Sequence, residues 1–248
     1  MQKTAILGIK ASNVTKNEAM EMCRGFLFDG AQHIITTPNP EMAVLALKDV
    51  EFASIFDKAD LCLPDGVGLI LAGKLFAMPL KERIAGSDFM IDLAGLAEKV
   101  EKSVYLLGAS DGVAKKAGEK IKEKYPNLKI VGAESGGDVF NLDDVEKQEL
   151  FQKINSVAPD ILFVAFGQVK QEKWIVENIP KLLSVKIAIG IGGAFDFIAG
   201  NAKRAPKIIR KIGLEWLWRL VLEPWRAKRI WNATFVFGWK CVLKKLNF

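Results

Sequence analysis

Hydrophobic patterning divides the first 200 residues into short apolar runs separated by longer amphipathic segments. The runs are rich in β-branched residues, and several are apolar throughout, as expected of parallel strands that are covered on both faces. They lie at Thr4–Ile9, His33–Thr37, Leu61–Leu63, Val104–Gly108, Lys129–Gly132, Ile161–Phe166 and Ile187–Ile191. Between them, apolar residues recur at three- and four-residue spacing, which predicts helices over Glu41–Asp57, Phe89–Glu101, Val113–Lys124 and Asp144–Val157.

This alternation of strands and helices predicts an α/β catalytic domain over residues 1–200, with a Rossmann-like, mainly parallel sheet flanked by helices. In such sheets, ligands bind beyond the carboxyl ends of the strands. The loops that follow the apolar runs are therefore the segments in which we look for functional residues.

The pattern changes after Gly200 and predicts a C-terminal basic amphipathic helical appendage over residues 201–248. One helical face carries Ile208, Ile212, Trp216 and Leu220, and the charge around it comes from Arg204, Lys207, Arg210, Lys211 and Arg219. Pro224 is expected to break this helix, after which a second segment repeats the pattern with Trp231, Phe235, Phe237 and Trp239.

Charge and tryptophan are concentrated in this appendage. Five of the six tryptophans lie in it, and residues 203–248 hold 12 Lys or Arg against 2 Asp or Glu. That is a net charge of +10, against +6 for the whole chain, which leaves −4 for residues 1–202. Clustered Trp with Lys and Arg is typical of a helix lying on an anionic lipid surface. The alternative is a C-terminal helix packed on its own sheet, and we favour the membrane surface.

Neither export nor a membrane span is predicted. The longest uncharged stretch of the tail, residues 230–239, has 10 residues, whereas crossing a bilayer takes about 20. The run Ala5–Ile9 is too short for the core of a signal peptide. Cys23, Cys62 and Cys241 are too dispersed for a disulfide framework or a zinc site. We expect a cytoplasmic protein that attaches peripherally to the membrane.

No metal or cofactor site is predicted. The single histidine, His33, is expected to be a strand residue, and the chain has neither a metal-ligand cluster nor an Asp-x-Asp pair. Gly190-Ile191-Gly192-Gly193 lacks the third glycine of a dinucleotide fingerprint, and Leu7-Gly8-Ile9-Lys10 does not supply one, which disfavours a nicotinamide-dependent oxidoreductase. A diphosphate leaving group would then be neutralised by Arg, Lys and helix N-termini.

Two strand-end segments carry polar residues that could bind a sugar or phosphate, or act as a base. Thr37-Pro38-Asn39-Pro40-Glu41 opens a helix, where the alternative is a capping box of Thr37 with Glu41. Pro64-Asp65-Gly66-Val67-Gly68 places an acid beside glycines, which makes Asp65 a candidate general base, although Asp is also a favoured N-cap.

Two further segments carry candidate binding residues. Arg83 could pair with a diphosphate through both of its terminal nitrogens, or form an ordinary ion pair with Glu82 or Asp88. Gly167 and the polar residues from Gln168 onward follow a strongly apolar run, as expected of a ligand-binding loop. The basic aromatic tail alone would also suit a nucleic-acid-binding protein, but that class leaves the Asp65 segment without a role.

Together these segments resemble the WecG/TagA/CpsF glycosyltransferase family over about residues 30–229, and their order and spacing are highly specific. The residues that carry the resemblance are Thr37-Pro38-Asn39, Pro64-Asp65-Gly66-Val67-Gly68, Glu82-Arg83 with Gly86 and Asp88, Gln171-Glu172-Lys173-Trp174, Phe195-Asp196 with Ala199-Gly200, Arg204-Ala205-Pro206, Gly213-Leu214-Glu215-Trp216 with Arg219-Leu220, and Glu223-Pro224. Val169 stands where the family usually has proline.

The resemblance implies metal-independent, inverting transfer of a sugar from a UDP donor to a polyprenyl-diphosphate-linked acceptor at the cytoplasmic membrane face. The chain is most similar to the branch that adds N-acetylmannosamine to undecaprenyl-diphosphate-linked N-acetylglucosamine in wall teichoic acid synthesis. UDP-N-acetylmannosamine uronate and UDP-glucose stay open as donors. The resemblance also implies homo-oligomers when the tail is not on a membrane.

The resemblance further implies a role for particular residues of this chain. Asp65 matches the catalytic base. The substrate-binding positions are Thr37, Asn39, Arg83 and Gln171, together with the tail arginines Arg219, Arg226 and Arg229, which fold over the pocket and contact the diphosphate. The appendage would in this way complete the active site.

Overall fold

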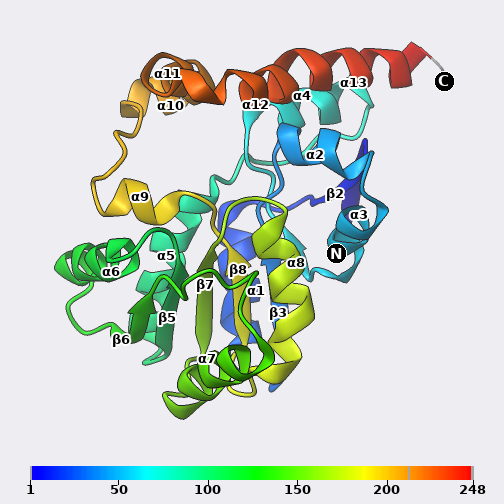
Figure 1. The fold of residues 1–248 in the computed structure, drawn as a ribbon. Helices are drawn as coiled ribbons and strands as arrows, with labels where there is room; N and C mark the ends of the chain where they lie inside the picture. Colours follow the sequence, from blue (N-terminus) through cyan, green and yellow to red (C-terminus); the bar gives the residue numbers. More distant parts are fainter. Residues whose placement is uncertain (1, 212, 247–248) are drawn as a thin grey trace.

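The main sheet is parallel throughout and has helices on both faces, with a run of helices crossing the end where its strands finish (Figure 1). A computed structural model describes residues 2–211 and 213–246. The strands are β3 (His33–Thr36), β4 (Leu61–Cys62), β5 (Ser103–Gly108), β6 (Lys129–Glu134), β7 (Ile161–Ala165) and β8 (Ile187–Gly190), in the order β4-β3-β8-β7-β5-β6. The predicted α/β class, with a mainly parallel sheet flanked by helices and a helical C-terminal appendage, is confirmed.

Apolar side chains on both faces of the strands make the core. All residues of β5 and β7 are buried, which is why their sequences are nearly continuous apolar runs. One face packs against helices α1 (Lys16–Phe26), α5 (Gly86–Lys99), α6 (Val113–Lys124) and α9 (Ala194–Ile198). The other packs against α7 (Asp144–Ser156), α8 (Lys170–Asn178) and the short 3-10 helix η1 (Ile179–Lys181).

A separate apolar cluster lies beside the β3–β4 edge of the sheet. It joins helices α2 (Pro40–Ala46), α3 (Val50–Lys58) and α4 (Val67–Leu75) to a hairpin and to the last helix of the chain. His33, at the start of β3, is a buried strand residue as predicted, and its Nε2 atom lies 2.9 Å from Asp29 Oδ2.

Two predicted elements are wrong in their extent. The expected strand Thr4–Ile9 is instead a hairpin of β1 (Lys3–Ile6) and β2 (Ile9–Ser12), which pair antiparallel outside the main sheet. Leu7 takes a φ of 51° in the turn between them. The expected helix Glu41–Asp57 is two helices, α2 and α3, because the Asp49 side chain accepts a hydrogen bond from Phe52 N (2.9 Å) and starts a new helix there.

The described part of the tail has six helical pieces: α10 (Lys207–Lys211), α11 (Glu215–Leu222), the 3-10 helix η2 (Pro224–Arg226), α12 (Ala227–Trp231), the π-helix η3 (Asn232–Val236) and α13 (Phe237–Leu246). The predicted break at Pro224 is confirmed, because α11 ends at Leu222. The predicted single face from Ile208 to Leu220 is wrong, since Gly213, with a φ of 80°, separates α10 from α11. Ile212, and the side chains of Lys207 and Lys211, lie outside the described residues.

The tail packs on the core with one face and leaves the other exposed. Phe237 and Cys241 are buried against α2 and α4. Trp231, Phe235 and Trp239, which follow one another at four-residue spacing, are more than half exposed. Within residues 2–211 and 213–246, no helix is long and apolar enough to cross a membrane.

Candidate active site

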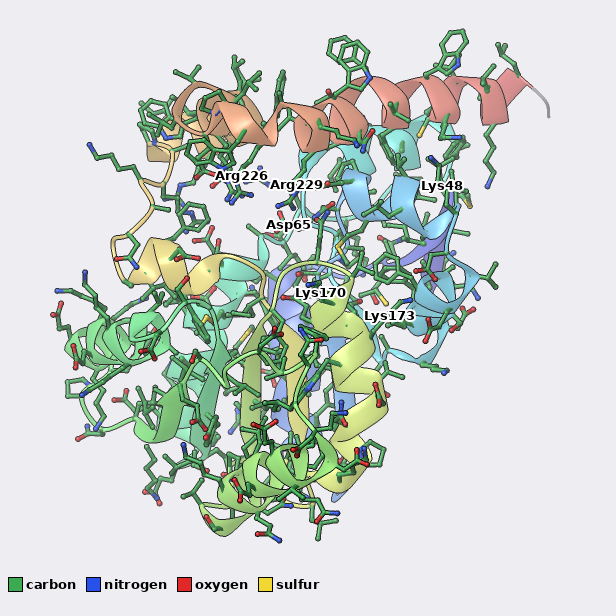
Figure 2. All side chains as sticks on the ribbon, viewed as in Figure 1. Lys48, Asp65, Lys170, Lys173, Arg226 and Arg229 are labelled. Carbon is green, nitrogen blue, oxygen red and sulfur yellow. The ribbon has the colours of Figure 1, made fainter. Side chains whose placement is uncertain are left out.

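The loops after β4, β3, β8 and β7 converge because these four strands are consecutive neighbours in the sheet. Together with the tail they line a cavity of about 810 Å³. In Figure 2, Asp65 lies between the sheet and the tail, and Arg226 and Arg229 reach toward it from above. All the residues predicted for the site line this cavity: Thr37, Asn39, Asp65, Arg83, Gln171, Arg219, Arg226 and Arg229. Their individual roles stay predictions.

Asp65 is held at the end of β4 by contacts of both its backbone and its carboxylate. Its N–H donates to Pro38 O (2.8 Å), and its Oδ2 accepts from the N–H of Gly86 (3.1 Å), the first residue of α5. The alternative interpretation as an N-cap of α4 is wrong, because Gly66 occupies that position and the cap has no side-chain hydrogen bond. The Asp65 carboxylate is therefore available to the cavity.

Burial dominates the electrostatics of Asp65. It raises the pKa of the carboxyl from 3.8 to about 6. The Gly86 N–H opposes this rise in pKa, the charge of Glu215 adds to it, and the charges of Arg83 and Arg204 oppose it. A carboxylate with this pKa is ionised at neutral pH and is a stronger base than an ordinary aspartate.

Thr37 and Asn39 follow β3 and fix the start of α2. Asn39 is the N-cap, since its Oδ1 accepts from Met42 N (3.0 Å), so the alternative of a capping box between Thr37 and Glu41 is wrong. The Thr37 hydroxyl instead donates to Gly190 O (3.1 Å) and links the ends of β3 and β8. The Asn39 amide nitrogen lies 3.4 Å from Gln168 Oε1 and faces the cavity.

Arg83 lines the cavity as a cation, and neither of the acids that might have neutralised it pairs with it. Glu82 accepts from Lys16 N (2.7 Å), and Asp88 holds Arg204 (2.6 Å) and Arg210 (3.3 Å). Among the described residues, no carboxylate oxygen lies within 4.0 Å of an Arg83 nitrogen. The alternative of an ordinary surface ion pair for Arg83 is therefore wrong.

The three tail arginines share two carboxylates above the cavity. Arg229 Nε donates to both oxygens of Glu41 (3.1 Å each). Arg226 pairs with Glu223, and Arg219 lies 3.8 Å from the same carboxylate. These guanidinium groups are held on the cavity wall by protein acids, which an incoming anion would partly replace.

Gln171 and Glu172 form a buried polar link between the loops that follow β7 and β8. Gln171 Nε2 donates to Glu172 Oε1 (2.7 Å), while Gln171 Oε1 accepts from Gly192 N (3.0 Å). The second Glu172 oxygen accepts from Val169 N (2.6 Å), and burial raises the pKa of Glu172 to about 7. Gln171 therefore shapes the cavity wall, with both ends of its amide already bonded within the protein.

Val169 adopts a φ of 71°, in the left-handed region. Proline cannot take that φ, so the loop at this position differs in geometry from that of a chain with proline there.

Comparison with known proteins identifies the group to which this arrangement belongs. The model of the glycosyl transferase WecG/TagA/CpsF family matches residues 4–248. The chain belongs to this family. The resemblance inferred from the motifs is thereby confirmed, and it extends beyond the predicted residues 30–229 at both ends.

Similar members of the WecG/TagA/CpsF family share one name, N-acetylglucosaminyldiphosphoundecaprenol N-acetyl-beta-D-mannosaminyltransferase. The protein of Bacillus subtilis (strain 168) is 41% identical over 197 residues, which is 79% of this chain and 74% of that protein. That of Bacillus spizizenii is 35% identical over 196 residues, with the same coverage. That of Staphylococcus aureus (strain MRSA252) is 30% identical over 230 residues, 92% of this chain and 88% of that protein.

Four acids of this WecG/TagA/CpsF family member were not assigned to the site from sequence. Glu41, Asp196 and Glu215 line the cavity, and Glu172 is buried beneath it. Glu41 lies in the segment that follows the strand ending at Thr36, and the other three stand in motifs that carry the family resemblance, but the sequence assigned no role to any of them. Within the described part of the chain, no three His, Cys, Asp or Glu side chains are grouped so that they could hold a metal ion.

Proposed function

We propose that this chain transfers N-acetylmannosamine from UDP-N-acetylmannosamine to N-acetylglucosamine linked to undecaprenyl diphosphate, the linkage step of wall teichoic acid synthesis. Family membership and the shared name of relatives at 30–41% identity support the proposal. The observation that carries it is the placement of Asp65, with its raised pKa, in a cavity lined by Arg83 and the tail arginines.

In the proposed reaction, Asp65 accepts the proton of the acceptor hydroxyl. The hydroxyl oxygen forms a bond to the anomeric carbon of the donor while the bond from that carbon to the UDP oxygen breaks. Attack from the face opposite UDP inverts the anomeric configuration. A pKa of about 6 keeps Asp65 ionised at neutral pH and ready to take the proton.

The negative charge that develops on the departing UDP would be stabilised by cations of the protein. Arg83 has no carboxylate partner among the described residues, and so it can pair with the diphosphate at no cost in existing contacts. Arg219 and Arg226 would exchange part of their contact with Glu223 for the phosphate oxygens. This provides charge stabilisation from side chains, in keeping with the metal independence that the resemblance implies.

The exposed side of the tail supports attachment to an anionic membrane at its inner face. Trp231, Phe235 and Trp239 form an outward stripe, and exposed Lys228 and Lys245 lie on the same helical run. When no membrane is present, the same stripe is expected to drive self-association. Flotation with anionic vesicles tests this, with Trp231→Ser combined with Trp239→Ser expected to release the protein.

A matched control for flotation is Phe28→Ser, because Phe28 is equally exposed but lies outside the tail. If the double tryptophan variant floats as well as the wild type, the stripe is not the attachment surface. If the wild type prefers single-stranded nucleic acid to anionic vesicles at matched salt, the nucleic-acid alternative replaces membrane attachment.

Release of UDP tests the reaction directly. The purified protein is incubated with a panel of UDP-sugars and a polyprenyl-diphosphate-linked N-acetylglucosamine acceptor. Acceptor-dependent release from UDP-N-acetylmannosamine is the expected result. Release only from UDP-N-acetylmannosamine uronate or UDP-glucose would reassign the donor, and no acceptor-dependent release from any donor would overturn the proposed reaction.

A further inference from the structure

One end of the cavity is apolar and is built from two helices that run alongside each other. A Cβ atom placed on Gly68, near the start of α4, would lie 3.5 Å from the Phe237 ring at the start of α13. Near the other end of both helices, Lys244 Nζ lies 5.7 Å from the centre of the Phe76 ring. The two helices therefore run in the same direction and form the two walls of a groove.

The α4 wall carries apolar residues at four-residue spacing. Val67, Leu71 and Leu75 all line the cavity and share one face of the helix. At 1.5 Å per residue, they span about 12 Å, starting two residues after Asp65. Leu71 and Leu75 are 59% and 39% exposed, although contact of large apolar side chains with water is unfavourable in free energy.

The tail wall changes from charged to apolar in the same direction. Along the chain, Arg226 and Arg229 line the cavity first, Ile230 and Ala233 follow, and Val242 on α13 comes last. Val242 is 43% exposed. The cavity is thus graded, from a carboxylate, through guanidinium groups, to an open apolar groove.

We propose that the apolar groove between α4 and α13 binds the first isoprene units of the acceptor lipid. The three zones of the cavity match the order of groups in a sugar linked through diphosphate to a polyprenol, with the sugar hydroxyl at Asp65, the diphosphate beside the arginines, and the prenyl chain along Leu71, Leu75 and Val242. This assignment rests on the proposed function for the nature of the acceptor. It adds the residues that distinguish a lipid-linked acceptor from the same sugar diphosphate without lipid.

The groove opens on the same helical run that carries the outward tryptophans. Ile230 and Val242 line the cavity, whereas Trp231, next to Ile230, and Trp239, three residues before Val242, are more than half exposed to solvent. A prenyl chain leaving the groove would therefore pass directly into a bilayer on which the tail lies. The acceptor would not have to leave the membrane completely to reach Asp65.

Calorimetry with two soluble ligands tests the groove without requiring turnover. Geranyl diphosphate carries a short prenyl chain, and methyl diphosphate carries the same charge without it. The wild type is expected to bind the geranyl compound at least tenfold more tightly, as expected from burying one or more leucine side chains. The variant Leu71→Ser with Leu75→Ser should bind both compounds with the affinity of the methyl compound.

Leu183→Ser is the matched control, because Leu183 is an exposed leucine that does not line the cavity, and it should keep the wild-type preference. Both leucines of the groove are partly exposed, so their replacement should leave the melting temperature nearly unchanged. Equal affinity of the wild type for the two compounds, or a preference that survives in the double variant, would overturn the groove assignment.

The transfer assay separates this inference from the proposed function. If the wild type shows the prenyl preference but transfers no sugar to any lipid-linked acceptor, the groove stands and the proposed reaction fails. If the wild type transfers N-acetylmannosamine but shows no prenyl preference, the reaction stands and the groove assignment fails.

Discussion

Replacing Asp65 with asparagine is expected to remove most transfer activity and also to stabilise the protein at neutral pH. Burial raises the pKa of this carboxyl from 3.8 to about 6, so its ionised form is disfavoured in the folded state. At 1.36 kcal/mol per pH unit, this difference corresponds to about 3 kcal/mol. Asparagine has nearly the same shape, keeps an oxygen that can accept from Gly86 N–H, and carries no charge. We expect Asp65→Asn to raise the free energy of unfolding by about 1–3 kcal/mol near pH 7.5.

The pH dependence has a defined sign. The folded protein holds the Asp65 proton more tightly than the unfolded chain, so wild-type stability rises as the pH falls from about 6 toward 3.8. The stability advantage of Asp65→Asn is therefore complete above pH 6 and disappears at the acidic end of that range. With Asp65 as the proposed base, the same pKa would govern catalysis, and wild-type kcat/KM should fall about tenfold per pH unit below pH 6.

The measurements are urea unfolding of both proteins at neutral and acidic pH, and UDP release in the presence of acceptor. Asp92→Asn is the control, because Asp92 pairs with Lys16 (2.8 Å) and lies outside the cavity. It should keep transfer activity and gain no stability at neutral pH. Near-wild-type turnover by Asp65→Asn would refute the assignment of the base. A variant no more stable than the wild type at neutral pH would refute the argument from burial.

Two further predictions concern how the tail is attached. Phe237→Ala should lower the free energy of unfolding by about 3–5 kcal/mol in denaturant titrations, because Phe237 is only 4% exposed and packs in the α2–α4 cluster. Phe235 is exposed, so Phe235→Ala should change the free energy of unfolding by less than about 0.5 kcal/mol. Similar effects of the two changes would contradict this packing. Gly213→Ala should loosen the tail and speed its proteolysis, because Gly213 has a φ of 80° and a Cβ there would lie 2.9 Å from Val67 Cβ. Gly25→Ala, with nothing within 4 Å, should leave the proteolysis pattern unchanged, and a Gly213→Ala tail as resistant as the wild type would exclude this role for the glycine.

The positions of the candidate residues could be predicted because strand ends are readable in this sequence. Continuous apolar runs such as Ile161–Ala165 mark parallel strands, and the residues after them lie at the edge where ligands bind. The sequence does not state which strand ends become neighbours. Asp65, Thr37 and Gln171 meet because β8 inserts between β3 and β7, although it follows both of them in the chain. Long-range pairing of this kind is decided by the packing of the whole sheet.

The errors at the N-terminal end have local causes. Gly8 favours a turn within Thr4–Ile9, but the apolar residues on both sides of it also fit one continuous strand, which is what we predicted. Asp49 is a favoured N-cap within a segment that otherwise has helical periodicity throughout. In both segments a single residue changes the direction of the backbone. Hydrophobic periodicity is judged over many residues at once and does not register such a single position.

The alternatives for the charged residues could not be separated from sequence, because an ion pair depends on side chains that are distant in the chain. Arg83 is adjacent to Glu82 and close to Asp88, and both were reasonable partners. In the fold, Asp88 is taken by Arg204 and Arg210 from the start of the tail. Asp88 is therefore paired with arginines of the tail instead of with Arg83, and the Arg83 guanidinium group lines the cavity without a carboxylate partner among the described residues.

The two interpretations of the tail, an interfacial helix and a helix packed on the protein, describe opposite faces of the same run of residues. Phe237 and Cys241 are buried on one side, and Trp231 and Trp239 are exposed on the other. The helical run from α12 to α13 therefore lines the cavity with one face and exposes on the other the side chains proposed to bind the membrane. In the proposed function, the position of this run on a bilayer and the shape of the cavity are linked. Removing the tail would take away part of the α2–α4 cluster together with the proposed membrane-binding face. Only substitutions on the outward face can separate attachment from catalysis.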